Sequence, residues 1–120
     1  MTLSQLRKVA TLTLMYAVQK KGTNKHKSVP KVSIIHNPKD GAFGVYKCDK
    51  NTIVVNTVHA SSLKLFIQTL LHEYTHYLQN MTTYSQLYKK VGYDKHPYEI
   101  ESRESEKLYS EAFKYIKELI

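Results

Sequence analysis

The apolar residues near the start of the chain recur every three or four positions. They are Leu3, Leu6, Ala10, Leu14 and Ala17. This spacing places them on one face of a helix, because a helix turns by about 100° per residue. Thr2 or Ser4 is suited to cap the start of the helix, and Gly22 is suited to end it after two lysines. The pattern predicts an amphipathic helix from Thr2 to about Lys20.

The next apolar segments are short and rich in β-branched residues. Residues 31–36 predict one strand, and residues 42–48 and 52–56 predict the arms of a hairpin joined by residues 49–51. The second arm is almost continuously apolar, as expected for a strand that is covered on both faces. The first arm alternates and contains Gly44, which is typical of an edge strand or a bulge. We therefore expect a small three-stranded sheet with an edge hairpin.

A second apolar stripe of helical spacing follows the hairpin. Its members are Leu63, Phe66, Ile67, Leu70, Leu71, Tyr74 and Leu78. Ser61 or Ser62 is suited to cap the start of this helix. His72 and His76 lie at the margin of the stripe, so that the helix can be buried and still present both side chains to a cleft.

The rest of the chain is polar before it becomes helical again. Residues 80–97 are rich in tyrosine and contain helix breakers, so we expect an irregular connection that holds a short helical turn around residues 84–89. One long helix is expected from Tyr98 to Ile120. Its core residues would be Ile100, Leu108, Ala112, Tyr115, Ile116 and Leu119. Together the elements predict a single α+β domain over residues 1–120.

The composition indicates the cellular environment of the protein. The single cysteine, Cys48, excludes an intramolecular disulfide, so we expect a reducing, cytoplasmic environment and a buried or half-buried thiol. Residues 1–21 lack an uninterrupted apolar segment and a cleavage site. We therefore expect neither a signal peptide nor a membrane partner.

The net charge of +8 is unevenly distributed. Residues 1–50 contain ten Lys and Arg against Asp40 and Asp49, whereas residues 51–120 contain eight residues of each sign. A basic half can attract nucleic acid or an acidic protein. It can also be a solubilising surface, and no basic motif interleaved with aromatic residues favours nucleic acid. A nucleic-acid partner therefore stays open.

The strongest chemical signal is the segment from His72 to His76, in which Glu73 follows the first histidine. Residues four apart share one face of a helix, so both imidazoles can bind one ion, and zinc is the metal that this pattern favours. Glu73 is placed to act as a general base on a water bound to the metal. Two ordinary histidines would bracket a glutamate by chance in only roughly one chain of this size in a few hundred, so we predict a Zn²⁺ site.

A catalytic zinc site needs a third protein ligand and an open fourth position. The extended pattern HExxHxxGxxH is excluded, because Gln79 and Thr82 stand where it requires Gly and His. The remaining acids gather at the start of the last predicted helix. They are Glu99, Glu101 and Glu104.

The combination of His72 to His76 with the segment Pro97-Tyr98-Glu99-Ile100-Glu101-Ser102 resembles the minimal glutamate zincins, in particular the ImmA/IrrE-type metallopeptidases of mobile elements and their phage-encoded relatives. The hairpin of residues 41–56 is similar to the edge hairpin before the metal helix in those proteins and in thermolysin. The resemblance covers roughly residues 30–112. It implies a zincin-like fold.

The resemblance also implies roles for single residues. His72 and His76 match the zinc ligands, Glu73 matches the general base, and Glu101 matches the ligand of the ExEA element, in which Ser102 replaces the usual Ala. Glu99 is the competing ligand and Glu104 is third, because the helix boundary decides which carboxylate turns inward.

The implied activity is zinc-dependent hydrolysis of peptide bonds in a protein or peptide substrate, with a regulatory protein as a further expected partner. In related zincins a His or Tyr after the metal helix steadies the oxyanion, and His96, Tyr98 and Tyr93 are the candidates here. The strand of residues 42–46 would pair with an extended substrate.

An alternative hypothesis is a non-catalytic binding module on the same scaffold. Such a module would bind nucleic acid or a regulatory protein through its basic half. The intact Glu73 argues against it, because a purely structural zinc site has no use for a base beside an open position. The other histidines are expected to be ordinary surface or loop residues. They are His26, His36 and His59.

Overall fold

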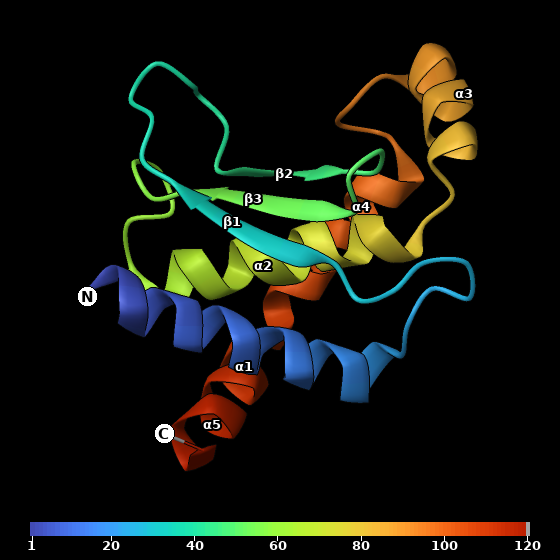
Figure 1. The fold of residues 1–120 in the computed structure, drawn as a ribbon. Coiled ribbons are helices and arrows are strands. Elements are labelled where there is room, and N and C mark those ends of the chain that lie inside the picture. The colour runs from blue at the N-terminus through green and yellow to red at the C-terminus, as the bar shows by residue number, and fades with distance from the viewer. Residues whose placement is uncertain (120) are drawn as a thin grey trace.

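The computed structural model describes residues 1–119, apart from the side chain of Met81. The elements in chain order are α1 (Leu3–Lys21), β1 (Lys31–Ile35), β2 (Gly44–Lys47), β3 (Thr52–Asn56), α2 (Leu63–Leu78), α3 (Met81–Val91), α4 (Pro97–Ser105), the short 3₁₀ helix η1 (Glu106–Leu108) and α5 (Tyr109–Leu119). Figure 1 shows the sheet above α2, with α1 and α5 below it. The α+β architecture with a small three-stranded sheet is as predicted.

Helix α1 matches its predicted range closely. The backbone N–H of Gln5 donates to the Thr2 hydroxyl, and the Gln5 side chain accepts from the Thr2 backbone, which together form a capping box. The helix ends at Gly22, whose φ of 77° lies in the left-handed region that favours glycine. Neither α1 nor any other helix within residues 1–119 combines the length and apolar content that crossing a membrane requires.

The sheet has the strand order β1-β3-β2, with β3 parallel to β1 and antiparallel to β2. Its central strand β3 buries Ile53 and Val55 completely, which explains the nearly continuous apolar run of that segment. The hairpin and the edge position of its first arm, β2, are confirmed. The sheet therefore leaves β1 at one edge and β2 at the other.

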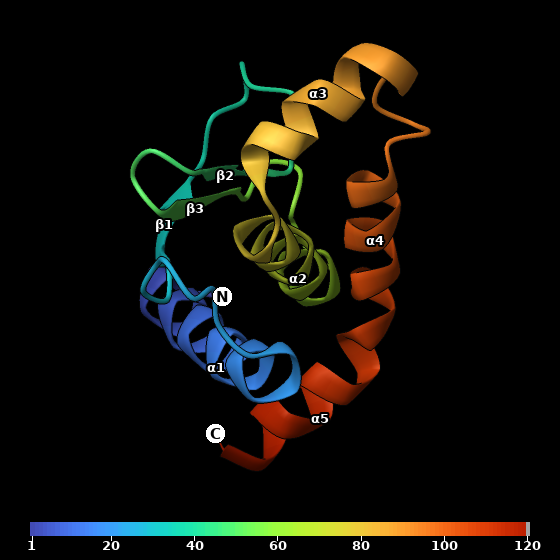
Figure 2. The ribbon, with the colours of Figure 1, turned by 90° about the vertical axis from the view of Figure 1, so that its right-hand side faces the viewer.

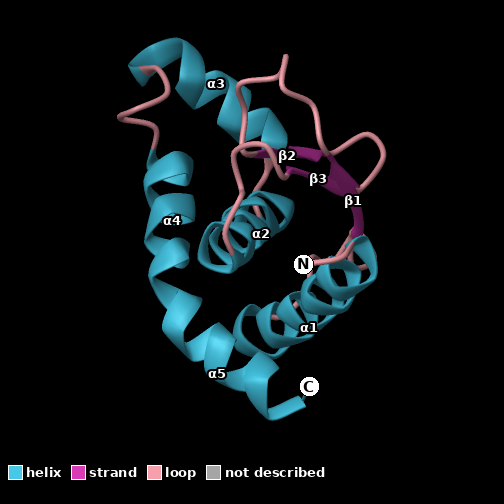
Figure 3. Ribbon diagram, turned by 90° about the vertical axis from the view of Figure 1, so that its left-hand side faces the viewer, coloured by secondary structure: helices cyan, strands magenta, loops and turns pink. Residues whose placement is uncertain are grey.

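Helix α2 lies at the centre of the molecule, as the two side views show (Figures 2 and 3). The sheet covers one of its sides, α4 a second and α1 a third. The backbone N–H of Leu65 donates to the Ser62 hydroxyl and caps the helix at its predicted start. Its core residues are almost inaccessible to solvent. They are Phe66, Ile67, Leu70, Leu71, Tyr74 and Tyr77.

The region after α2 differs from the prediction. Residues 81–91 form a regular helix, because the Asn80 side chain caps its start and Gly92 ends it with a φ of 76°. The expected single long helix is divided into α4 and α5 by the turn of η1. Ile100 is exposed rather than part of the core, since the buried side of α4 carries Glu99 and small serines instead.

The expectation of a buried or half-buried thiol is also wrong. Cys48 is exposed, because it lies in the turn of the β2–β3 hairpin, where side chains face solvent.

Gly44 allows β2 to approach α2 closely. A Cβ atom at this position would lie 2.7 Å from Thr69 Cγ2, 2.8 Å from the Val54 carbonyl oxygen and 3.6 Å from Glu73 Cγ. The first two distances are shorter than van der Waals contact permits. The absence of a side chain at Gly44 therefore sets the distance between the edge strand and the helix that carries the histidines.

Replacement of Gly44 with Ala should lower the free energy of unfolding by roughly 1–3 kcal/mol, because the added methyl group must push β2 and α2 apart. Urea unfolding followed by circular dichroism measures this change. Gly41→Ala is the matched control, since a Cβ at that position meets nothing within 4 Å. Equal stability of the two variants would contradict the proposed close approach.

Candidate metal centre

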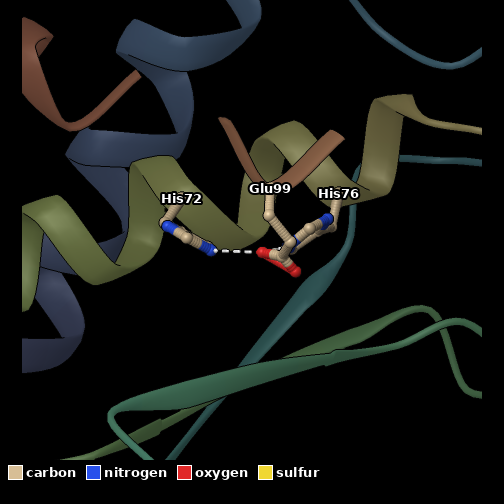
Figure 4. A group of neighbouring side chains, drawn as sticks. All are labelled: His72, His76 and Glu99. Atoms are coloured by element: carbon tan, nitrogen blue, oxygen red, sulfur yellow. Dashed lines mark hydrogen bonds and ion pairs between the residues drawn. The ribbon is translucent and has the colours of Figure 1, made fainter. Parts of the chain in front are cut away.

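Helices α2 and α4 bring three potential metal ligands together (Figure 4). The Nε2 atoms of His72 and His76 lie 3.2 and 2.9 Å from the same oxygen, Oε1 of Glu99. The ligand atoms of the three residues all lie within 4.8 Å of one another. Glu99 is only 2% exposed and His76 only 7% exposed. This group can hold a metal ion.

Two imidazoles and one carboxylate form a donor set that several divalent metals accept, zinc among them. Two ligands at about 2.0–2.1 Å from a tetrahedral zinc ion are separated from each other by roughly 3.3 Å. The separations of 3.2 and 2.9 Å between Glu99 and the two imidazoles are close to this value. Two imidazoles and one carboxylate are also the ligands of one class of catalytic zinc sites, in which the fourth position stays open.

The start of α4 decides which carboxylate faces the histidines. The Nδ1 atom of His96 accepts from the backbone N–H of Tyr98, and Pro97 occupies the first helical position. Deeper in the helix, the hydroxyl of Ser105 donates to the Leu71 carbonyl of α2, and Ser102 is completely buried. These small side chains let α4 pack tightly against α2.

Glu99 rather than Glu101 therefore reaches the histidines. The two residues are separated by about 200° around the helix, so only one of them can face α2. Glu101 points outward and its Oε1 accepts from the Gln79 side chain at 2.7 Å. Glu104 is exposed and pairs with Lys107 at 2.8 Å. The structure therefore places Glu99, the competing residue of the sequence analysis, beside the histidines in place of the preferred Glu101.

Each potential ligand is held by a second hydrogen bond. The Nδ1 atom of His72 lies 2.8 Å from Oε2 of Glu106, and Nδ1 of His76 lies 2.7 Å from Oε1 of Gln79. These acceptors favour the tautomer in which Nε2 is free to bind a metal. The Tyr84 hydroxyl donates to Oε2 of Glu99 at 2.6 Å and leaves Oε1 for the histidines.

The charges in this cluster depend on one another. Burial alone would lower the pKa of His72, but its hydrogen bond to Glu99 and the nearby carboxylates of Glu73 and Glu106 raise it to about 9. Burial alone would raise the pKa of Glu99, but hydrogen bonds from His72, His76 and Tyr84 hold it well below its usual range. The carboxylate of Glu99 is therefore ionised and is the central charge of the group.

Glu73 lies beside the three ligands. It is 8% exposed, and the backbone N–H of Tyr46 in β2 donates a hydrogen bond to its carboxylate. Burial raises its pKa, and Glu99 adds to the effect, while the two histidines oppose it. A carboxylate with a raised pKa is a better proton acceptor than an ordinary one.

Two cavities of about 470 and 290 Å³ adjoin the cluster. Both are lined by Gly44, His72, Glu73 and Tyr93. His72 and the carboxylate of Glu73 therefore border a space that a bound molecule can occupy.

The candidates for oxyanion stabilisation are not equivalent. His96 is completely buried, and both of its ring nitrogens have backbone partners, in Tyr98 and Tyr84. The Tyr98 carbonyl accepts from Gln79, and Tyr98 lines neither cavity. Tyr93 lines both cavities and is 49% exposed. Of the three, Tyr93 has the access that the role requires.

Three contributing residues escaped the sequence analysis as members of the site. Glu106 contacts His72, Gln79 contacts His76, and the Tyr84 hydroxyl donates to Glu99. Tyr84 also stacks on His96, with ring centroids 4.1 Å apart. Tyr84 lies in α3, and Asn80 and Gly92, which cap this helix, are the signals in the sequence that could have predicted it.

Comparisons of the chain with protein families, with curated proteins and with solved structures find no match.

Replacement of Glu99 with Gln should abolish stable zinc binding, because it removes the negative charge between the two imidazoles. Elemental analysis after dialysis against zinc measures the zinc content per chain, and circular dichroism checks the fold. Glu101→Gln is the matched control on the same helix and should keep its zinc. Zinc retention by Glu99→Gln together with zinc loss by Glu101→Gln would return the ligand role to Glu101.

Replacement of Glu106 with Gln should weaken zinc binding by about 10–100-fold without abolishing it, because Glu106 contacts only the far nitrogen of His72. Competition with a chromogenic zinc chelator measures the dissociation constant. Glu111→Gln removes a charge from an exposed residue of α5 and should leave the constant unchanged. A complete loss of binding would instead place Glu106 among the direct ligands.

Proposed function

We propose that the chain is a zinc-dependent peptidase with a zincin-like fold of the glutamate-zincin kind, and that it hydrolyses peptide bonds in a protein substrate. The single observation that carries this proposal is the position of Glu73. Its buried carboxylate borders the same cavities as His72, next to a group that can hold a metal ion. A site that only stabilised the fold would not need a buried base at its rim.

In this proposal His72, His76 and Glu99 hold the zinc. Bound zinc supplies a Lewis acid that polarises a carbonyl group and makes a water molecule acidic. Glu73 accepts a proton from the attacking water and delivers it to the leaving amine. The raised pKa of Glu73 supports both transfers, because the group then exchanges protons closer to neutral pH.

The register of β2 provides a place for the substrate backbone. Phe43 accepts from the Asn56 N–H, and Val45 is paired with Val54, so the backbone groups of Gly44 face away from β3. Gly44 lines both cavities at the metal centre. An extended substrate can therefore pair with this edge, with its scissile bond near Glu73.

Tyr93 completes the proposed machinery. It lies in the segment between α3 and α4 and lines both cavities together with Glu73. Burial raises the pKa of its hydroxyl, and the charges of Glu99 and Glu73 raise it further. A hydroxyl that stays protonated can donate a hydrogen bond to an oxyanion.

Replacement of Glu73 with Gln should reduce peptide hydrolysis by about 10²–10⁴-fold and leave zinc binding intact, because Glu73 is not a ligand in this arrangement. The assay is cleavage of a fluorescence-quenched mixture of randomised decapeptides, with zinc content measured on the same samples. Glu104→Gln, an exposed residue of α4, is the control. Activity in the Glu73→Gln variant equal to that of the parent would reject the peptidase and support a binding module.

A further inference from the structure

A long apolar groove lies between α1 and β1, away from the metal centre. Its volume is about 770 Å³, which exceeds that of either cavity beside the histidines. Its apolar lining includes Leu14, Met15, Val18, Val29, Val32 and Ile34. Met15 is 45% exposed and Val29 is 41% exposed, so a substantial apolar surface faces solvent here.

The groove runs along an unpaired edge of the sheet. Within residues 1–119, β1 pairs with β3 alone. Lys31 donates to the Asn51 carbonyl, and the Ile35 carbonyl accepts from Thr57, so alternate residues of β1 bond to β3. The backbone N–H and C=O groups of the intervening Val32 and Ile34 therefore point to the open edge. Their side chains line the groove at the same place.

The charged residues that line the groove have one sign. Residues 1–39 contain eight Lys and Arg and no acidic residue. Two of the basic residues, Arg7 and Lys31, line the groove itself. Because α1 and β1 run in opposite directions (Figure 1), Arg7 near the start of α1 and Lys31 at the start of β1 belong to opposite ends of the groove.

We propose that this groove binds an extended segment of a partner protein, apolar in its centre and acidic at both ends, as a fourth strand beside β1. The open backbone groups of Val32 and Ile34 would pair with the segment, and its inward side chains would cover the apolar face of α1. Acidic residues at its ends would face Arg7 and Lys31.

The positive charge of the groove and its apolar lining favour an acidic peptide segment over a second copy of the chain or nucleic acid. A second copy of the chain would add a further segment of eight cations, and the residues that line the groove include no acidic residue to pair with them. Nucleic acid would bury its phosphates against a largely apolar lining that contains no aromatic ring for stacking. An acidic peptide segment satisfies the edge, the apolar lining and the charge together. The groove lies at the opposite sheet edge from the metal centre, so the proposal does not depend on the peptidase activity.

The first test uses a fluorescein-labelled peptide, Glu-Glu-Val-Thr-Val-Thr-Val-Glu-Glu, and fluorescence anisotropy. Its centre matches the five residues of β1, a length of about 16 Å. The peptide should bind, and replacing its four glutamates with lysines should weaken binding at least about tenfold. Absence of binding at about 1 mM, or equal binding of the lysine peptide, would overturn the proposal.

The second test changes the groove. Met15→Glu places a negative charge in the lining and should weaken binding of the glutamate peptide at least about tenfold. Ser4→Glu makes the same change in net charge on the same helix but outside the groove, and should change binding less than about twofold. Thermal unfolding checks that both variants fold. If both variants lost binding affinity equally, the effect would come from net charge alone, and the groove would be rejected as the binding site.

The third test separates strand addition from other modes of binding. Two peptides are N-methylated at alternate positions, one at the odd and one at the even residues of the central segment. In one of them the methyl groups replace the N–H donors that would face β1, and in the other those donors remain. One methylated peptide should lose binding and the other should retain it. Equal behaviour of the two would overturn strand pairing. A dimer in sedimentation equilibrium that the peptide does not dissociate, or displacement of the peptide by a short DNA duplex, would assign the groove to another occupant.

Discussion

The carboxylate of Glu99 is the interaction on which the site depends. The residue is only 2% exposed, and its carboxylate contacts the imidazoles of His72 and His76 and accepts a hydrogen bond from the Tyr84 hydroxyl. A charge in such a place is costly unless it is fully paired, and removing one partner of a buried pair typically costs about 3–5 kcal/mol. The contacts of Glu99 therefore link α2, α3 and α4 and set the electrostatics of the candidate metal centre.

Helix α2 shows how one segment can serve both the core and the site. The side that faces the sheet and α1 supplies completely buried residues such as Phe66, Leu70 and Tyr74. His72 and His76 lie at the margin of that side, where α4 approaches. Since tight packing leaves little freedom to a central helix, the imidazoles are placed before any ligand arrives. Gly44 extends this placement to β2, because it lets the edge strand come within reach of Glu73.

The sequence predicted the features that depend on neighbouring residues and missed those that depend on contacts between distant helices. Local signals worked well: the Thr2 cap, the Ser62 cap and the apolar run of β3 all lie where expected. The carboxylate that faces the histidines depends on the rotation of α4 about its axis, which the cap of His96 and Pro97 and the packing of Ser102 determine. The apolar periodicity did not choose between Glu99 and Glu101, because it assigned Ile100, which lies between them and is exposed, to the core. The contributions of Glu106 and Tyr84 likewise require knowledge of which helices meet.

The two edge strands of the sheet, β1 and β2, lie beside cavities with different linings. At the β2 edge, backbone groups face a cavity lined by the ionisable residues Glu73 and His72, and Gly44 keeps the strand close to the helix. At the β1 edge, they face an apolar groove with a basic rim. Exposed strand edges invite pairing with other chains, and natural proteins usually protect them. Here each sheet edge lies beside a lining of different chemistry, so an extended segment that pairs with β1 would have to differ in charge and polarity from one that pairs with β2.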